Sequence, residues 1–247
     1  MNLIIDTLNW LASEFGPDGR LWLRIGEHLF YTIISVLIAS AIAIPVGYFI
    51  GHTGRGREIA VGIAGAARAL PSFGLMLLLV SLVGVLQAPL AAIAAFVILA
   101  IPSILAGAYS GIQAIPRTTI DAARAVGMTE WQILWKVEAP LGLHLLLGGL
   151  RSGTLQVVAT VTLAAYINLG GLGYDILQGI PLRRDDQVLG AAIVVIVLAL
   201  LLDTLFGATT QVVDRLIPNG APTARPRSKL RPAPTRRPAA VGAPTNS

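Results

Sequence analysis

Long apolar runs, each about the length of a bilayer crossing, alternate with short polar links along this chain of 247 residues. The clearest run, residues 29–50, holds 22 consecutive positions without a charged side chain, and a helix that spans a bilayer needs about 20 apolar residues. Inside lipid the backbone must satisfy its own polar groups, so such runs fold as helices. The pattern therefore predicts an all-α, polytopic membrane protein with about five transmembrane helices. The predicted spans are residues 29–50, 59–86, 90–112, 141–168 and 188–213.

Three of these spans carry charged side chains inside the apolar run: Arg68, Arg151 and Asp203. Arg68 lies just before Pro71, where we expect the second span to bend before it crosses. Arg151 lies 11 residues after Pro140 and Asp203 lies ten residues before the end of its span, which puts both roughly 15 Å from the same face. A lone charge at mid-bilayer costs about 2.5–3.5 kcal/mol, so we expect Arg151 and Asp203 to form a structural ion pair. Two alternatives are that Arg68 pairs with Asp203 and that these charges line a solute path.

The ends of the chain differ from the spans. Residues 1–28 begin with apolar side chains at helical spacing and continue into a turn. We therefore expect a poorly ordered leader with a short amphipathic helix, lying at the outer surface of the membrane that the chain spans. Residues 168–187 predict a glycine-rich loop on the same side of the membrane. Residues 217–247 hold almost no large apolar side chains, and this composition is typical of a disordered basic tail. The membrane domain would then be residues 29–216.

The longest polar run between the first span and the tail is residues 121–140. Alanines in its first half favour a helix that Gly127 interrupts, and Thr129 followed by Glu130 can start a second helix. Pro140 is expected to end this unit, because the residue before a proline is pushed out of the α region. The run therefore predicts two short helices outside the lipid, between the third and fourth spans.

The spacing within this run resembles the EAA loop of ABC-importer permeases. That pattern is Glu-Ala-Ala, three residues, Gly, nine residues, Ile, one residue and Leu-Pro. Every spacing is matched, with Asp in place of Glu, Val in place of Ile and Ala in place of Leu. The matching positions are Asp121, Ala122, Ala123, Gly127, Val137, Ala139 and Pro140. The resemblance implies that this loop is a cytoplasmic helix that docks in a groove of a separate ATP-binding subunit and couples ATP hydrolysis to the membrane helices.

Other segments resemble the osmoprotectant branch of these permeases, which takes up glycine betaine, carnitine, choline and similar quaternary ammonium compounds. The segments are EHL at 27–29, LPSFGL at 70–75, GLR at 149–151, NLGGLGYDIL at 168–177 and LLLD at 200–203. This resemblance implies that the chain is the permease subunit of an ATP-driven importer. An alternative is an importer for another small solute, such as an amino acid.

The resemblance also implies a set of partners. They are the ATP-binding subunit, which would carry ATP and magnesium, a second permease chain, identical or a sibling, and the lipid bilayer. Some members of the branch fuse a substrate-binding domain to the permease, but only a short low-complexity segment follows the last span here. We therefore expect a separate extracytoplasmic substrate-binding protein. No cofactor is expected in the chain itself.

Composition narrows the remaining classes. The chain is 55% apolar and 13% charged, with a mean hydropathy of +0.74, whereas soluble domains carry roughly twice that charged fraction. The absence of cysteine excludes disulfides and thiolate metal sites, and the phosphate-binding loop GxxxxGK[ST] is missing, so ATP is not expected to bind by that route. The net charge of +5 belongs mostly to the tail and does not predict nucleic-acid binding. An intramembrane enzyme would need paired catalytic groups at matching depth, and the spans of this sequence do not show them. The EAA spacing argues against an ATP-independent channel or carrier.

The distribution of lysine and arginine predicts the orientation. With five spans, one side of the membrane holds twelve of these residues and the other holds four. Half of the twelve lie in the tail, so without it the two sides differ little. The side with more basic residues is expected to be cytoplasmic. This puts the EAA loop and the C-terminus inside and the N-terminus outside, in the cytoplasmic membrane of a bacterium.

Overall fold

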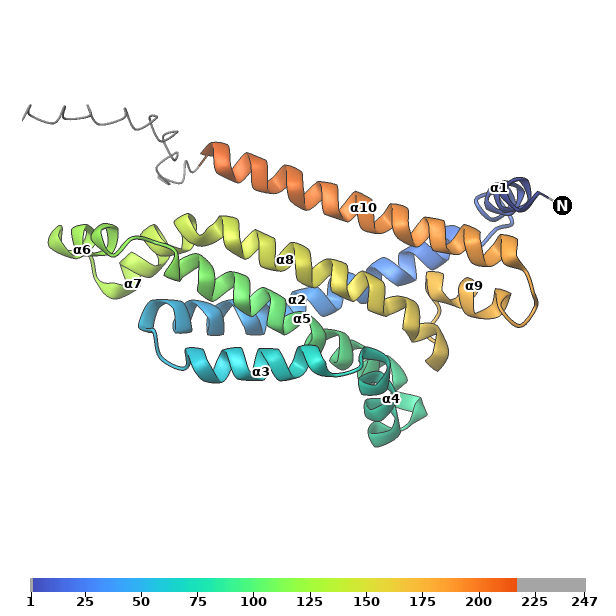
Figure 1. Cartoon of the computed structure of the whole chain (residues 1–247), viewed down its shortest axis with the longest axis horizontal. Coiled ribbons are helices and arrows are strands. Elements are labelled where there is room, and N and C mark those ends of the chain that lie inside the picture. Colours follow the sequence, from blue (N-terminus) through green and yellow to red (C-terminus); the bar gives the residue numbers. More distant parts are fainter. Residues whose placement is uncertain (1, 217–247) are drawn as a thin grey trace, which may run out of the picture.

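The computed structural model describes residues 2–216, and the part of the chain it describes is entirely helical (Figure 1). The predicted basic tail at 217–247 lies outside the described residues. The elements are α1 Leu3–Glu14, α2 Leu21–Thr53, α3 Arg57–Ala69, α4 Ser72–Val83, η1 Val85–Gln87, α5 Ala88–Gln113, α6 Arg117–Ala125, α7 Glu130–Ile133, the π-helical turn η2 Leu134–Glu138, α8 Ala139–Val161, η3 Thr162–Ile167, α9 Leu172–Gly179 and α10 Asp185–Leu216.

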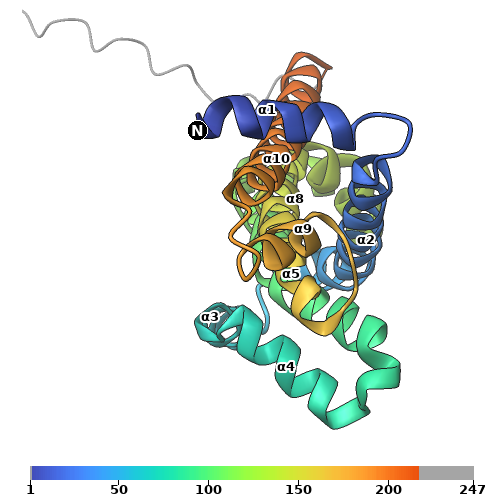
Figure 2. The same cartoon turned by 90° about the vertical axis from the view of Figure 1, so that its right-hand side faces the viewer.

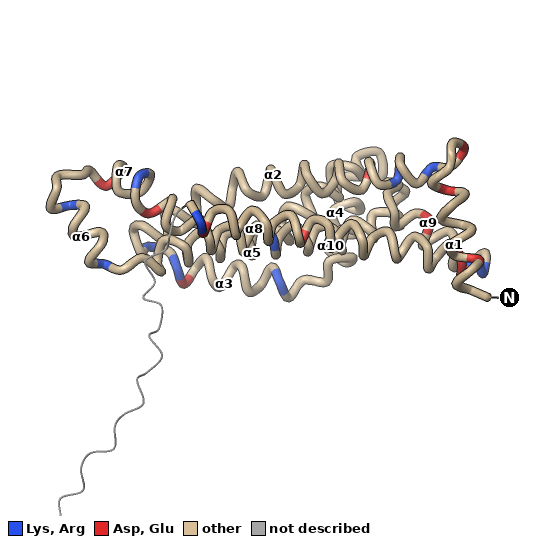
Figure 3. The backbone as a smooth tube through the Cα atoms, turned by 90° about the horizontal axis from the view of Figure 1, so that it is seen from above, with Lys and Arg blue, Asp and Glu red and all other residues tan. Residues whose placement is uncertain are grey.

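Four of these helical segments are long and apolar enough to cross a membrane: Leu21–Thr53, Val85–Gln113, Glu130–Ile167 and Asp185–Leu216. They run along the long axis of the molecule, and charged residues gather mainly at its two ends (Figure 3). A fifth span results if the bent pair α3–α4 is counted as one crossing. The prediction of an all-helical membrane protein with about five spans is confirmed.

The centre of the fold is α5, which packs against α2 on one side and α8 on the other (Figure 2). Small residues permit both contacts. On α2, Ala39, Ala43 and Gly47 recur every four residues and are buried, and a Cβ atom at Gly47 would lie 2.5 Å from the Cβ of Ala108. Because lipid tails give helices no hydrophobic reason to associate, such close packing holds spans together.

The contact between α5 and α8 is closer, because glycine meets glycine. A Cβ atom added to Gly149 would lie 2.7 Å from the carbonyl oxygen of Ser103 and 2.9 Å from the Cα of Gly107. Nearer the α6 end, Gly111 and Gly142 face each other in the same way. Backbone against backbone therefore fixes the position of α8 relative to α5.

The second apolar run bends as predicted. α3 and α4 meet at an angle of 91°, and the break falls at Leu70 and Pro71, which both have extended backbone. The α3–α4 elbow projects from the bundle of α2, α5 and α8 (Figure 2).

Three local expectations need correction. The leader is not poorly ordered, because α1 packs on α10 with Trp10 buried, and the first long helix begins at Leu21 rather than at Leu29. The expected loop at 168–187 contains the helix α9, which packs against α10. Pro140 does not end a helix: Ala139 has helical backbone angles, and α7, η2 and α8 form one continuous helical segment. The wider π turn just before Pro140 accommodates a residue that cannot donate to the carbonyl four positions back.

The α5–α8 contact leads to a stability prediction. Replacing Gly149 by valine should lower the free energy of unfolding by at least about 1–3 kcal/mol, because the added atoms would overlap the α5 backbone. Thermal unfolding of the detergent-solubilised protein measures this. The matched control is Gly148→Val, since a side chain at Gly148 meets no atom within 4 Å. Equal melting temperatures for the two variants would contradict the proposed backbone contact.

Candidate functional site

The segment between α5 and α8 holds the predicted coupling loop. α6 and α7 project at the end of the molecule opposite to α1 and α9 (Figures 1 and 3). Within α6, Ala123 is buried, whereas Asp121 and Ala122 are exposed. The two exposed residues are therefore available on the surface of the loop.

Gly127 makes the turn between α6 and α7. Its φ angle is +84°, in the left-handed region that residues other than glycine and asparagine rarely adopt. A Cβ atom there would meet nothing within 4 Å, so the backbone conformation, and not the available space, requires glycine. The amide of Gly127 donates to the carbonyl of Arg124 at 2.9 Å, and that of Met128 donates to Ala123 at 3.2 Å, which caps α6.

The second helix begins at Thr129, as the sequence predicts. The Thr129 hydroxyl accepts a hydrogen bond from the backbone amide of Gln132 at 3.4 Å, and the Gln132 side chain accepts one from the amide of Thr129 at 3.0 Å. This reciprocal capping box satisfies donors that the start of a helix otherwise leaves unpaired.

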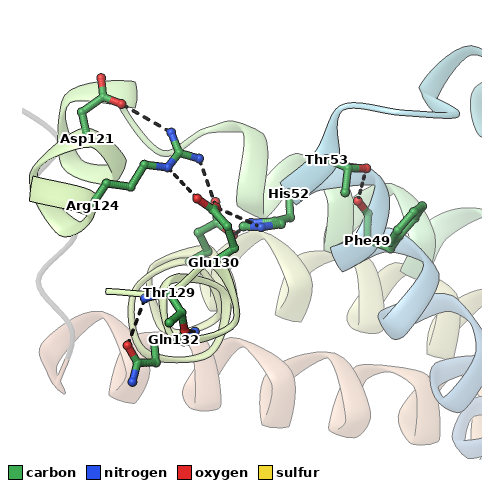
Figure 4. A network of polar contacts seen from close by, with 9 residues as sticks. Phe49, His52, Thr53, Asp121, Arg124, Thr129, Glu130 and Gln132 are labelled. Carbon is green, nitrogen blue, oxygen red and sulfur yellow. Dashed lines mark hydrogen bonds and ion pairs between the residues drawn. The ribbon is translucent and has the colours of Figure 1, made fainter. Parts of the chain in front are cut away.

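A network of charged side chains ties this loop to the end of α2 (Figure 4). Arg124 donates to both oxygens of Glu130, at 2.8 and 3.1 Å, and lies 3.5 Å from Asp121. His52 lies 3.3 Å from Glu130 through Nε2 and 2.5 Å from Glu138 through Nδ1. The hydrogen bonds to Glu130 raise the pKa of the Arg124 guanidinium above its ordinary value. The network links α2, α6, α7 and η2.

Sequence reasoning missed the roles of His52 and Glu138 in this network. Glu138 is buried although it is charged, and its contact with His52 spans 86 positions along the chain. The only signal was a charged residue at the end of the apolar stripe of α7 and η2, and that signal does not identify a partner.

The loop also carries exposed apolar side chains. Val126 is 78% exposed, Trp131 is 69% exposed and Trp135 is 51% exposed. The two indole rings pack edge to face with centroids 5.7 Å apart. A separate cavity of about 520 Å³, lined in part by His52, Arg124 and Glu138, opens between the end of α2, the end of α5 and α6. Apolar groups grouped on a polar loop are typical of a surface that binds another protein.

The three charges predicted inside the apolar runs, all of them among the described residues, divide into one pair and one separate cation. Arg151 donates to Asp203 through Nε at 2.5 Å and through Nη2 at 2.6 Å, so the structure brings these two residues together. Arg68 does not contact Asp203; it donates to the carbonyl of Pro102 at 3.4 Å. A second contact between α8 and α10, from His144 to Asp214 at 2.8 Å, lies nearer the α6 end.

Two of the sequence segments noted above meet at the opposite end. The Glu27 carboxylate accepts a hydrogen bond from the amide of Gly171 at 2.7 Å, and Arg24 lies 3.2 Å from Glu27 and stacks 4.0 Å from the ring centre of Tyr174. The fully buried His28 contacts the carbonyl of Val158 at 3.1 Å. These contacts join the start of α2 to the loop before α9, to α9 itself and to the end of α8.

Comparisons with known proteins agree with this architecture. Residues 43–217 match the family described as binding-protein-dependent transport system inner membrane component. The carnitine transport permease protein OpuCB of Listeria monocytogenes is 32% identical over 80% of this chain and 90% of its own length. The osmoprotectant import permease protein OsmW of Salmonella typhimurium is 31% identical over 81% of this chain and 94% of its own length.

A solved structure shares the fold. Inward-facing conformations of the MetNI methionine ABC transporter include a chain that superposes with a TM-score of 0.71 at 22% identity, over 78% of this chain and 95% of that one. The family match covers most of the chain. The chain therefore belongs to the binding-protein-dependent inner-membrane components, the multi-pass permease subunits of ABC importers.

Proposed function

We propose that this permease serves an importer of quaternary ammonium osmoprotectants such as glycine betaine, carnitine and choline. The supporting observation is the set of relatives at about 30% identity, among them the glycine betaine/carnitine/choline transport system permease protein OpuCB of Bacillus subtilis, 30% identical over 77% of this chain and 87% of its own length. The methionine transporter shares the fold at lower identity, so it does not favour an amino acid as the solute. The chain is the membrane component and not the enzyme of the transporter, and ATP and magnesium belong to a separate subunit.

We further propose that the loop formed by α6 and α7 is the contact with the ATP-binding subunit. Exposed Asp121, Ala122, Val126 and Trp131 would form the docking face, and the turn at Gly127 would set the angle between the two short helices. This loop is then cytoplasmic and the α1–α9 end is external, where a substrate-binding protein would deliver the solute.

A second permease chain, identical or a sibling, would cover the exposed side of α3. Gly62 and Gly65 have no atom within 4 Å of an added Cβ, so a surface suited to close helix packing has no neighbour among the described residues. The two chains would enclose the solute path between them.

Within the chain, the role proposed for Arg151 and Asp203 is structural. Two parallel hydrogen bonds between a guanidinium and a carboxylate form a strong, directional pair. This pair lies between α8 and α10, and each charge lowers the cost of holding the other inside the bilayer.

The substrate proposal is tested by reconstituting the permease with its ATP-binding subunit and binding protein in proteoliposomes. We expect ATP-dependent uptake of labelled glycine betaine, carnitine or choline. Uptake without ATP, or uptake of an amino acid with none of the three quaternary ammonium compounds, would contradict the proposal.

The coupling proposal is tested at Gly127. Gly127→Val should leave the protein inserted but reduce binding of the ATP-binding subunit and transport by about tenfold or more, because a β-branched residue is strained in the left-handed region. Gly127→Asn is the matched control, since asparagine tolerates this conformation. Co-purification of the ATP-binding subunit and uptake are the readouts. If Gly127→Val couples as well as Gly127→Asn, the turn is not required for docking.

The ion pair is tested by a charge swap. Arg151→Asp and Asp203→Arg should each lower the level of folded protein several-fold, because each leaves like charges facing inside the membrane. The double variant should recover part of that loss. Size-exclusion chromatography of the solubilised protein measures it. A double variant no better than the worse single variant would argue against a structural pair.

A further inference from the structure

A polar hollow lies inside the elbow between α3 and α4, facing the middle of α5 and α8. Its volume of about 420 Å³ falls within the range of roughly 300–1,000 Å³ typical of small-molecule sites. Ser103 is near the middle of α5 and Ser152 is near the middle of α8, so the hollow lies at mid-depth of the two central spans. Its polar side chains are Arg68, Ser72, Ser103, Ser152 and Gln156.

The charge of Arg68 is not neutralised within the described residues. No carboxylate of residues 2–216 lies within 4.0 Å of Arg68, and its one hydrogen bond, to the carbonyl of Pro102, is long at 3.4 Å. A guanidinium has five N–H donors, so most of its capacity remains available to a ligand. An ionisable group held in a span without a partner indicates a site that faces water or a solute rather than lipid.

The serine hydroxyls and the glutamine side-chain amide next to Arg68 are also available to bind a ligand. Serines inside helices commonly donate to the carbonyl four residues earlier, as Ser40 and Ser81 do here. Among the described residues, the hydroxyls of Ser103 and Ser152 make no such bond. The Ser72 hydroxyl and the side-chain amide of Gln156 also have no hydrogen-bond partner there. The hollow therefore combines one cation with several uncommitted hydrogen-bonding groups.

The start of α4 adds to the positive character of this site. Leu70 and Ser72 line the hollow, and the residue before the helix is Pro71, which makes no side-chain cap. The first amides of α4 are thus uncapped, and the N-terminus of a helix carries a partial positive charge. Among residues 2–216, none of those lining the hollow is acidic.

We propose that this hollow is a transit site for the carboxylate of a small zwitterionic solute, with Arg68 as the residue that recognises it. The proposal rests on the proposed function and narrows it to solutes such as glycine betaine and carnitine, in preference to choline, which has no carboxylate. The planar guanidinium matches a carboxylate with two parallel hydrogen bonds. A single cation on a flexible side chain binds loosely enough to release the solute along the path.

The distribution of carboxylates argues against a structural role in which Arg68 forms an ion pair with an identical second permease chain. Asp203 is the one carboxylate near mid-depth of the described spans, and Arg151 already holds it. An identical copy would therefore offer Arg68 no uncommitted carboxylate at this depth.

The first experiment measures uptake by the whole complex in proteoliposomes, with glycine betaine and choline as the paired solutes. Arg68→Gln should lower glycine betaine uptake by about tenfold, because it removes a charge-assisted contact with the carboxylate. It should change choline uptake far less. Arg68→Lys should retain part of the activity, and Arg55→Gln, which removes a cation from the link between α2 and α3, should change neither solute. Equal loss of both solutes in Arg68→Gln, or no loss, would overturn the assignment.

A second experiment does not depend on the solute. The chain has no cysteine, so Ser152→Cys places a single thiol in the hollow. We expect the anionic sulfonatoethyl methanethiosulfonate to label this thiol faster than the cationic trimethylammonioethyl reagent, and we expect Arg68→Gln to reverse or remove that preference. No labelling, or a preference independent of Arg68, would reject the anion site. If the wild-type complex takes up none of the quaternary ammonium compounds but this preference holds, the proposed substrate class fails while the anion site stands.

Discussion

The close approach of α5 to its two neighbours is the constraint on which the other features depend. Inside lipid, packing and hydrogen bonds must supply what the hydrophobic effect supplies in water. Here two of these contacts are between backbones, Gly107 with Gly149 and Gly111 with Gly142, and in a third Gly47 packs on the Cβ of Ala108. Helices that touch at the backbone cannot slide or rotate by much without a clash. The positions of α2 and α8 are therefore fixed relative to α5, and so are the side chains on their remaining faces.

This rigidity gives the loop formed by α6 and α7 a physical connection to the membrane helices. Because the helical segment continues from α7 through η2 into α8, a force on the loop acts directly on a spanning helix. The contacts from His52 to Glu138 and Glu130 tie the end of α2 to the same unit. Under the proposed function, a movement of the ATP-binding subunit would shift α2, α5 and α8 as one body.

The sequence predicts the features that depend on length, composition or depth. Hydrophobic runs identify the spans, the Leu-Pro break at 70–71 identifies the bend, and equal distances from one face anticipate that Arg151 and Asp203 meet. It does not predict features that depend on tertiary contacts. The helix α9 and the docking of α1 require burial against α10, which no local pattern encodes. The rule for prolines failed at Pro140 because a π turn, itself invisible in the sequence, removes the clash.

Arg151 and Arg68 show two ways in which a chain can meet the cost of placing an arginine inside a membrane span. Arg151 on α8 is paired with Asp203 on α10 within the chain. Arg68 has a carbonyl oxygen and a set of uncommitted hydroxyls around it, in a hollow where the described part of the chain places no acidic residue. A chain that needed only stability would gain by replacing such a residue with an apolar one. An unneutralised cation at mid-depth is consistent with a solute that supplies the missing charge as it passes, and a permanent internal partner would abolish that use.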